Sequence, residues 1–396
     1  MRPIRNWGVE RSAHKDEVNG RRVWQLTNHE APSAHFYFTR PSWLEGWPRP
    51  FFVSDRGNVA NLYTFDEDWS VLQLTDLPRV EGGKYWTSYN GKTSFRAQQF
   101  GANFMAAEAD PNGGGIYFSS GFGEQHLMRY DFASGKTEKL FDHAAGCITS
   151  DGRYSLFQSF DDDYEKKLRH TKLYRIDLAT GARDFLYEDD GDFAHMLCSP
   201  VAPELVIWIS YHRRKGMTIN PRTGELGTWV DFAEEPKHRV YYHYSFLPKS
   251  SLLLCAHRGD IDCTVAGTGG KQIVWEIRSA DGDVADQLKA WNGEAIAHAT
   301  VSHDHRRVVG DTCRHDHFVE DDPAKKKNNI YLFDRELRTS SVVCAADSSF
   351  SARDEKGRQV YSEYLHPRPV FSPDDKKVIF DSDFTSGITQ VYMVGL

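Results

Sequence analysis

Six of the seventeen histidines in this 396-residue chain recur at one place in a repeating pattern, at the start of short apolar segments. They are His35, His143, His195, His243, His298 and His366. The spacing is regular, because His143 and His366 each lie fourteen residues before a phenylalanine, Phe157 and Phe380. Packing explains one such histidine, but six at equivalent positions indicate imidazoles that converge on one site. The chemistry expected of them is proton transfer or metal binding.

A second recurring group is basic and follows the second apolar segment of several repeats. It comprises Arg213, Arg214, Lys215, His257, Arg258 and Arg314. Solvated surface charge would explain any one of them, but their recurrence predicts a pocket for an anion such as a carboxylate, which arginine binds through two N–H groups. Nearby aromatic residues could stack on sugar rings, with core packing as the competing interpretation; they are Trp43, Trp47, Tyr85, Trp86, Tyr241, Tyr242 and Tyr244.

These residues need a scaffold that repeats, and the sequence indicates an all-β one. Aromatic residues make up 13% of the chain and there are 31 glycines, which favours many short strands joined by turns. Units of four strands start near residues 35, 103, 143, 195, 243, 298 and 366, with Asn103 in place of histidine in the second unit. Seven units use almost the whole chain, so residues 1–396 are predicted to form a single seven-bladed β-propeller domain. Residues 78–100 are expected to form a long surface loop.

The two ends of the chain indicate how the ring closes. Two segments read almost alike, Val23-Trp-Gln-Leu-Thr27 and Val71-Leu-Gln-Leu-Thr75, and only the second follows its own pair of strands. The last unit ends after Thr389-Gln-Val-Tyr-Met393 and lacks a fourth strand. The N-terminal strand is therefore predicted to complete the last blade, which removes open sheet edges.

Composition excludes several classes of partner and site. The net charge of −8 offers no general surface for nucleic acid or an anionic membrane. The six cysteines form no CxxC pair, which predicts buried free thiols. No signal peptide or long apolar run occurs, so a cytoplasmic location is expected.

With this pattern in view, the chain resembles the oligogalacturonate lyase family of cytoplasmic seven-bladed propellers, which cleave oligouronides by β-elimination. The resemblance rests on residues 20–27, His35-Phe-Tyr-Phe38, Gly293-Glu294 before His298, and the segment His366-Pro-Arg-Pro-Val-Phe-Ser-Pro-Asp-Asp375. The family binds manganese through three histidines and a glutamine. The resemblance implies that His298 and His366 are two of the histidines, that Glu363 replaces the glutamine, and that Arg368 replaces the third histidine. Either a divalent metal is bound or Arg368 neutralises the substrate carboxylate in its place.

The resemblance also implies a division of labour. The family's catalytic base matches His243, and its substrate-binding arginine maps near Arg213, Arg214 and Lys215. His195 is the alternative base, and Tyr244 or His143 could protonate the leaving oxygen. His35, His257, Arg258, Arg314 and Arg368 are expected to contact an acidic oligosaccharide.

Two other classes of function remain open at this point. One is a TolB-like propeller that binds a peptide or sugar without chemistry, which the Ser-Asp-Arg and Ser-Asp-Phe motifs at 54–56 and 382–384 also suit. The other is a sugar hydrolase, which would need two facing carboxylates where the aligned repeats place histidines.

Overall fold

The structure is a computed structural model that consists of strands and connecting segments. It describes residues 3–78, 86–88, 94–95, 102–120, 126–143, 146–163, 168–191, 193–234, 241–262, 271–288, 296–312, 328–348, 351–353, 359–361 and 366–396. Within these ranges, some strand residues, including Asn103, Tyr241, His257 and Arg258, are described by their backbone alone. The helical content of the described residues is one turn of 3-10 helix, Arg56–Asn58. None of them forms a helix that is long and apolar enough to cross a membrane.

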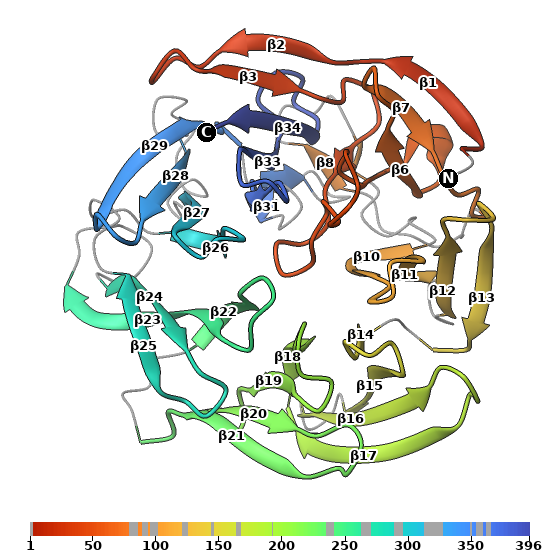
Figure 1. Ribbon diagram of the computed structural model, residues 1–396, viewed down its shortest axis with the longest axis vertical. Helices are drawn as coiled ribbons and strands as arrows, with labels where there is room; N and C mark the ends of the chain where they lie inside the picture. The colour runs from red at the N-terminus through yellow and green to blue at the C-terminus, as the bar shows by residue number, and fades with distance from the viewer. Residues whose placement is uncertain are drawn as a thin grey trace.

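Seven sheets stand around a central axis as the blades of a β-propeller (Figure 1), which confirms the predicted fold. The first three blades consist of β4 (Ser33–Ala34), β5 (Phe52–Ser54), β6 (Asn61–Phe65) and β7 (Ser70–Gln73); β10 (Ala102–Ala109), β11 (Gly115–Ser120), β12 (His126–Asp131) and β13 (Thr137–Phe141); and β14 (Cys147–Ile148), β15 (Tyr154–Asp163), β16 (Leu168–Asp177) and β17 (Arg183–Asp190).

The next three blades are built in the same order from the inside outward. They consist of β18 (Phe193–Cys198), β19 (Val206–Ser210), β20 (Lys215–Ile219) and β21 (Leu226–Asp231); β22 (Tyr241–Phe246), β23 (Leu253–Asp262), β24 (Lys271–Arg278) and β25 (Val284–Leu288); and β26 (Ile296–Val301), β27 (Arg307–Thr312), β28 (Asn329–Asp334) and β29 (Thr339–Ala345). Three of the inner strands therefore begin two residues before a predicted site histidine, which fixes those histidines on the inner wall of the ring.

The N-terminal strand completes the last blade, as the repeats predict. The blade contains β32 (Val370–Phe371), β33 (Lys377–Ser382) and β34 (Gln390–Gly395), and β3 (Arg22–Gln25) pairs with β34 in the register Val23↔Val394. The N-terminal segment also adds two outer strands that the sequence did not suggest. Strand β2 (Ser12–Lys15) lies outside β3, and β1 (Arg5–Val9) lies outside β7 of the first blade.

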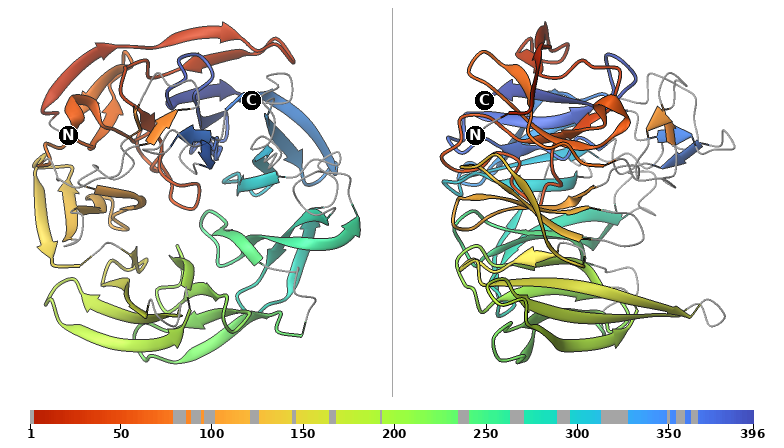
Figure 2. Two further views of the ribbon diagram at one scale, coloured as in Figure 1. Left: turned by 180° about the vertical axis from the view of Figure 1, so that it is seen from behind. Right: turned by 90° about the vertical axis from the view of Figure 1, so that its right-hand side faces the viewer.

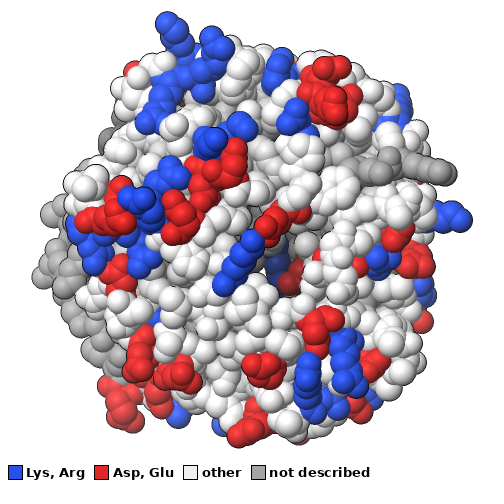
Figure 3. All heavy atoms as spheres, in the orientation of Figure 1, with Lys and Arg blue, Asp and Glu red and all other residues white. Residues whose placement is uncertain are grey.

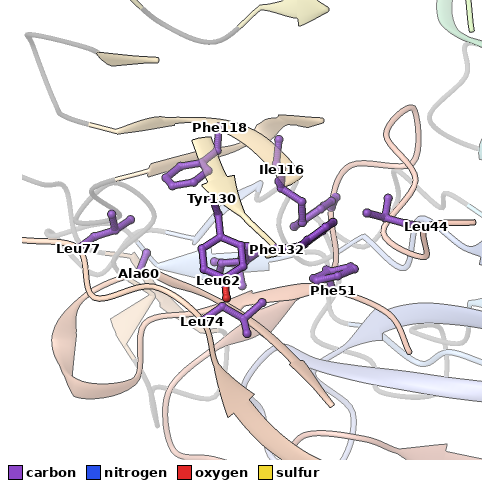
Figure 4. Packing of buried hydrophobic residues seen from close by; sticks show 13 residues of the cluster. Leu44, Phe51, Ala60, Leu62, Leu74, Leu77, Ile116, Phe118, Tyr130 and Phe132 are labelled. Atoms are coloured by element: carbon purple, nitrogen blue, oxygen red, sulfur yellow. The ribbon is translucent and has the colours of Figure 1, made fainter. Parts of the chain in front are cut away.

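Apolar side chains from neighbouring blades interlock and hold the ring together. Between the first two blades, Leu62 and Leu74 pack with Ile116, Phe118 and Tyr130 (Figure 4), and each of these five is at most 1% exposed. Truncation of a buried phenylalanine in such a core costs about 3–5 kcal/mol of stability. The inter-blade packing therefore gives the inner strands fixed positions relative to one another.

Tight hairpins join the third and fourth strands, and their sequence explains their shape. In the second and third blades, Asp131 and Asp177 accept backbone hydrogen bonds from Ser134 and Thr180 through their side chains. Gly135 and Gly181 follow with φ of 68° and 75°, in the left-handed region that glycine adopts without steric cost.

An eighth sheet corrects the expectation for residues 78–100. Its strands are β8 (Trp86–Ser88), β9 (Ser94–Phe95), β30 (Ser351–Arg353) and β31 (Gln359–Tyr361). Strands β30 and β8 pair, so the connections before the second and seventh blades meet. This small sheet lies on one face of the ring (right-hand view of Figure 2). The connection predicted as a loop thus contributes strands. The sequence did not indicate them, because β8 pairs with β30, which is more than 250 residues away in the chain.

Candidate functional site

Four of the six predicted histidines lie side by side on the inner wall. His195, His243, His298 and His366 come from four consecutive blades, and we call them the histidine row. Their neighbouring ring centroids are 5.9, 4.5 and 4.8 Å apart in that order. His195 and His243 are partly exposed, whereas His298 and His366 are 3% and 1% exposed. The row therefore runs from two partly buried residues to two fully buried ones.

A segment of the first blade crosses the ring and packs against the row. The loop between β4 and β5 reaches toward the middle of the ring in Figure 1, and we call its residues 35–40 the plug segment. Tyr37 stacks on His195 with the rings parallel at 5.6 Å, and Phe38 contacts the rings of His243 and His298 edge to face. The plug segment thus holds three members of the row by aromatic contacts.

Arg40 anchors the far end of the plug segment to two other blades. Its guanidinium forms a buried ion pair with Glu108 at 2.8 Å and donates to the backbone carbonyl of Met196 at 3.1 Å. Burial raises the pKa of Glu108, and the charge of Arg40 opposes that rise. The two contacts of Arg40 therefore link the first, second and fourth blades. They do so next to His195, because Met196 follows His195 in the chain.

Burial keeps the row neutral. Desolvation lowers the pKa of His195 to about 4 and lowers the pKa values of His243, His298 and His366 well below 6.5. The Nδ1 atom of His243 lies 2.5 Å from the carbonyl oxygen of Ala297, which can only accept a hydrogen bond. The proton of neutral His243 therefore sits on Nδ1, and Nε2 carries the lone pair of the ring.

The buried end of the row forms the cluster that could hold a metal ion. His298, Asp311 and His366 each offer a ligand atom, and these atoms lie within 4.8 Å of one another. The two Asp311 oxygens accept hydrogen bonds from the backbone N–H groups of His298 and Arg368, and both lie near Nδ1 of His298. A carboxylate that faces one ring nitrogen and leaves Nε2 for the cation is the usual surrounding of a metal-bound histidine. The donor set therefore fits a divalent cation, with Asp311 orienting His298.

Arg368 lies beside this cluster, but its charge is already balanced. It is 2% exposed and donates from Nη2 to Oδ2 of Asp381 at 3.0 Å. Burial raises the pKa of Asp381 to about 7, against the influence of Arg368. His35 closes the group, since its backbone N–H donates to Asp381 and its Nε2 lies 3.8 Å from the same carboxylate. Arg368 and His35 are therefore buried and held by Asp381, and that they contact substrate stays a prediction.

Three site residues have a strained backbone. His195, Arg214 and Arg368 have φ of 49°, 55° and 47°, a region that non-glycine residues seldom adopt. Tyr244 stabilises this backbone conformation of His195, because its hydroxyl donates a hydrogen bond to the His195 carbonyl at 2.7 Å. Tyr244 is fully buried, and burial raises the pKa of its hydroxyl well above 10. It positions His195 and is not placed to protonate a leaving group.

The other predicted donors lie away from the row. His143 stacks on Phe157 at 4.2 Å instead of joining the other histidines. Arg213 pairs with Asp189, Arg214 donates to the carbonyl of Phe232, and Lys215 pairs with Asp231 at 2.7 Å. Arg214 and Lys215 are thus held by their own blade, and Arg213 is held by the third blade. That they bind a substrate carboxylate stays a prediction.

Several predictions lie outside what the structure describes. Glu363 and Arg314 belong to undescribed segments, and the side chains of His257 and Arg258 are not described. The same holds for the side chains of Tyr85, Trp86, Tyr241 and Tyr242. Among the other aromatic candidates, Trp43 and Trp47 pack in hydrophobic clusters, which favours the core interpretation for both. Of the cysteines, four are described, and all are buried free thiols as predicted: Cys147, Cys198, Cys255 and Cys344.

Comparison with known proteins identifies the architecture. No family model matches the chain, and no curated protein matches its sequence. Among solved structures, an oligogalacturonate lyase in complex with manganese superimposes with a TM-score of 0.76 at 18% identity, over 100% of this chain and 98% of that one. The chain has the oligogalacturonate lyase fold. A second oligogalacturonate lyase, from Vibrio parahaemolyticus, gives a TM-score of 0.75 at 15% identity, with coverage of 100% and 98%.

A third similar structure shows how widely this propeller is shared. A puromycin hydrolase matches with a TM-score of 0.52 at 14% identity, over 96% of this chain and 58% of that one. At such identities the likeness concerns the fold, and function must be argued from the site. The resemblance to the oligogalacturonate lyase family is thus confirmed at the level of the fold.

Proposed function

We propose that the protein is a lyase that cleaves uronate-containing oligosaccharides by β-elimination. The observation that carries the proposal is the neutral His243, whose Nδ1 faces the Ala297 carbonyl and whose ring lies 4.5 Å from that of His298, a member of the cluster that could hold a cation. A base beside a cationic centre is the arrangement needed to remove a proton next to a carboxylate. The similarity to oligogalacturonate lyase structures supports the same chemistry.

Each step can be assigned to a side chain of the row. The Nε2 atom of His243 takes the proton at C5 of the uronate, and the electron pair left behind is delocalised onto the carboxylate. The C4–O bond then breaks, and a double bond forms between C4 and C5. His195, whose ring centroid lies 5.9 Å from that of His243, is the neighbouring imidazole that can accept this proton from protonated His243 and pass it on to the leaving oxygen, so that both rings return to the neutral state. Tyr37 and Tyr244 hold His195 in place.

The carboxylate needs a positive partner, and the geometry favours a cation over Arg368. A divalent cation at this point would act as a Lewis acid that neutralises the carboxylate. His298 and His366 are its expected ligands, with Asp311 behind His298. Arg368 is already paired with Asp381 and buried, so its charge is already balanced. Manganese is the ion we propose, because the solved oligogalacturonate lyase that this chain superimposes on is a complex with manganese.

Formation of the unsaturated product tests the proposal. Purified protein is incubated with pectic, glucuronan and ulvan oligosaccharides, and the conjugated product is followed by ultraviolet absorbance. We expect product from at least one substrate, and a loss of about 10²–10⁴-fold in rate for His243→Ala. The matched control is His170→Ala, an exposed histidine paired with Glu188 and Asp190 on the third blade. Full activity of His243→Ala would show that the base is assigned wrongly, and silence across all substrates would favour a binding propeller.

A further inference from the structure

The seam where the last blade closes against the first carries an alternating stack of arginine and tryptophan side chains. Arg22 lies 5.5 Å from the ring of Trp24, and Arg11 lies 4.6 Å from the same ring. Arg11 also lies 5.5 Å from Trp69, and Arg49 lies 4.4 Å from Trp69. We call these five residues the arginine–tryptophan ladder. It connects β3, the segment before β2, and the first blade across the closure.

The arginines of the ladder have no acidic partner. Elsewhere in this acidic chain, exposed arginines pair with carboxylates, as Arg153 does with Asp177 and Arg306 with Glu336. Among the described residues, no carboxylate oxygen lies within 4.0 Å of a guanidinium nitrogen of Arg11, Arg22 or Arg49. Arg11 and Arg22 are therefore not neutralised by an ion pair, whereas Arg49 donates to the backbone carbonyls of Pro48, Asp66 and Glu67 and is held by them.

The surroundings reinforce this local positive charge. Residues 1–24 contain six arginine and lysine residues against three aspartate and glutamate residues, although the whole chain has a net charge of −8. In Figure 3, Lys and Arg side chains gather at the upper left, over the β2 and β3 hairpin of Figure 1. One of the three acidic residues, Glu10, is itself paired with the buried Arg56. An anion that approaches this edge of the ring meets positive charge that is largely uncompensated.

The stacking makes the guanidinium groups suitable for binding carboxylates. A guanidinium that lies on an indole ring keeps its N–H groups directed outward in its own plane, and it loses little freedom when it binds. Carboxylates are bound by such planar groups through two parallel hydrogen bonds. The guanidinium groups of Arg11 and Arg22, which both stack on Trp24, match a ligand that carries carboxylates on linked units, and Arg49 fixes the Trp69 end of the ladder.

We propose that the arginine–tryptophan ladder is a second, non-catalytic binding site for the carboxylates of a linear oligouronide chain. The choice of this ligand rests on the proposed function, since the same polymer is then the substrate of the histidine row. The ladder lies at the outer rim and the row on the inner wall, so a chain bound at the rim is retained on the enzyme between cleavages. The ladder raises affinity for long chains and does not act on the bond that is cleaved.

Affinity electrophoresis in gels containing polygalacturonate tests the proposal on the full chain. The variant Arg11→Gln/Arg22→Gln removes two guanidinium groups from the ladder. The control Arg153→Gln/Arg306→Gln removes two arginines that lie outside the ladder, on the third and sixth blades. Each of them has a carboxylate partner, Asp177 or Glu336. We expect the ladder variant to bind the polymer about two- to thirtyfold more weakly than the wild type, which is the range that the loss of two exposed charge pairs gives. The control variant is expected to bind as the wild type does.

A second pair of measurements separates this inference from the proposed function. With a trisaccharide substrate, the ladder variant should cleave at the wild-type rate, because a short chain does not span both sites. Wild-type and ladder-variant proteins that bind the polymer equally would overturn the ladder proposal, even if both cleave the trisaccharide. Loss of polymer binding in the ladder variant would support it, even if no protein cleaves. Neutral dextran should not displace the polymer, and displacement by dextran would contradict recognition of carboxylates.

Discussion

The buried pair of Arg368 and Asp381 should couple strongly in a double-mutant cycle. The two side chains are 2% and 0% exposed, and their 3.0 Å contact neutralises a guanidinium and a carboxylate in the wall of the ring. Arg368→Met leaves Asp381 without its partner, and Asp381→Asn leaves the guanidinium without its partner. Removal of one member of a buried pair costs about 3–5 kcal/mol. In the double variant neither charge remains, so we expect a coupling free energy of about 2 kcal/mol or more.

Urea unfolding followed by tryptophan fluorescence measures this coupling, with the dependence of the free energy of unfolding on pH as a second readout. Burial raises the pKa of Asp381 from 3.8 to about 7, so the folded state binds its proton more tightly than the unfolded state. The stability from this group is present below pH 3.8 and is lost as the pH rises through about 7. Asp381→Asn should remove this part of the slope. Single-variant costs below about 1 kcal/mol, or costs that simply add, would refute the account of the pair.

Three further outcomes follow from the site. Because burial lowers the pKa of His243, this base stays neutral as the pH falls through 6.5, and kcat/KM should stay level there; a fall centred at 6.5 would contradict its burial. Tyr244→Phe leaves the His195 carbonyl without its donor, so we expect a loss of about 1–3 kcal/mol of stability and a lower kcat with little change in KM. A variant with wild-type kcat and stability would argue against a role of Tyr244 in positioning His195. Added manganese should raise the unfolding temperature of the wild type and not that of His366→Ala, and equal shifts in both would place the ion elsewhere.

The architecture could be predicted from the sequence because short repeated segments of the chain indicate it. The near-identical segments Val23–Thr27 and Val71–Thr75, together with a last unit one strand short, indicate closure without any knowledge of long-range contacts. The histidines of the row could be predicted in the same way, since three of them lie two residues after the start of an inner strand and His366 lies shortly before the inner strand of the last blade. His143 shares the spacing of His366 but not its place in the row. Its ring stacks instead on that of Phe157 in its own blade, with the centroids 4.2 Å apart.

What could not be predicted depends on contacts between distant parts of the chain. Tyr37 and Phe38 look like ordinary strand residues, and only the path of the plug segment across the ring brings them against His195 and His298. The partners of the basic residues are likewise set by the fold, as for Arg213 and Asp189.

Two acidic residues of the site could also have been predicted from the sequence. Asp311 and Asp381 end the similar segments Val308-Val-Gly-Asp311 and Val378-Ile-Phe-Asp381, at the same place in neighbouring blades. Each accepts the backbone N–H of a residue in the next blade, Arg368 for Asp311 and His35 for Asp381. A repeated buried aspartate at a strand end thus marks a group that joins blades and orients a histidine.

The masses of the reaction products test the central claim most directly. A single uronate oligosaccharide of known length is incubated with the protein, and the two products are weighed by mass spectrometry. Elimination predicts that the two product masses sum to the mass of the substrate, with the double bond in the fragment that carries the new non-reducing end. A sum larger by one water would show hydrolysis and contradict the account, and intact substrate across the pectic, glucuronan and ulvan oligosaccharides would contradict catalysis itself.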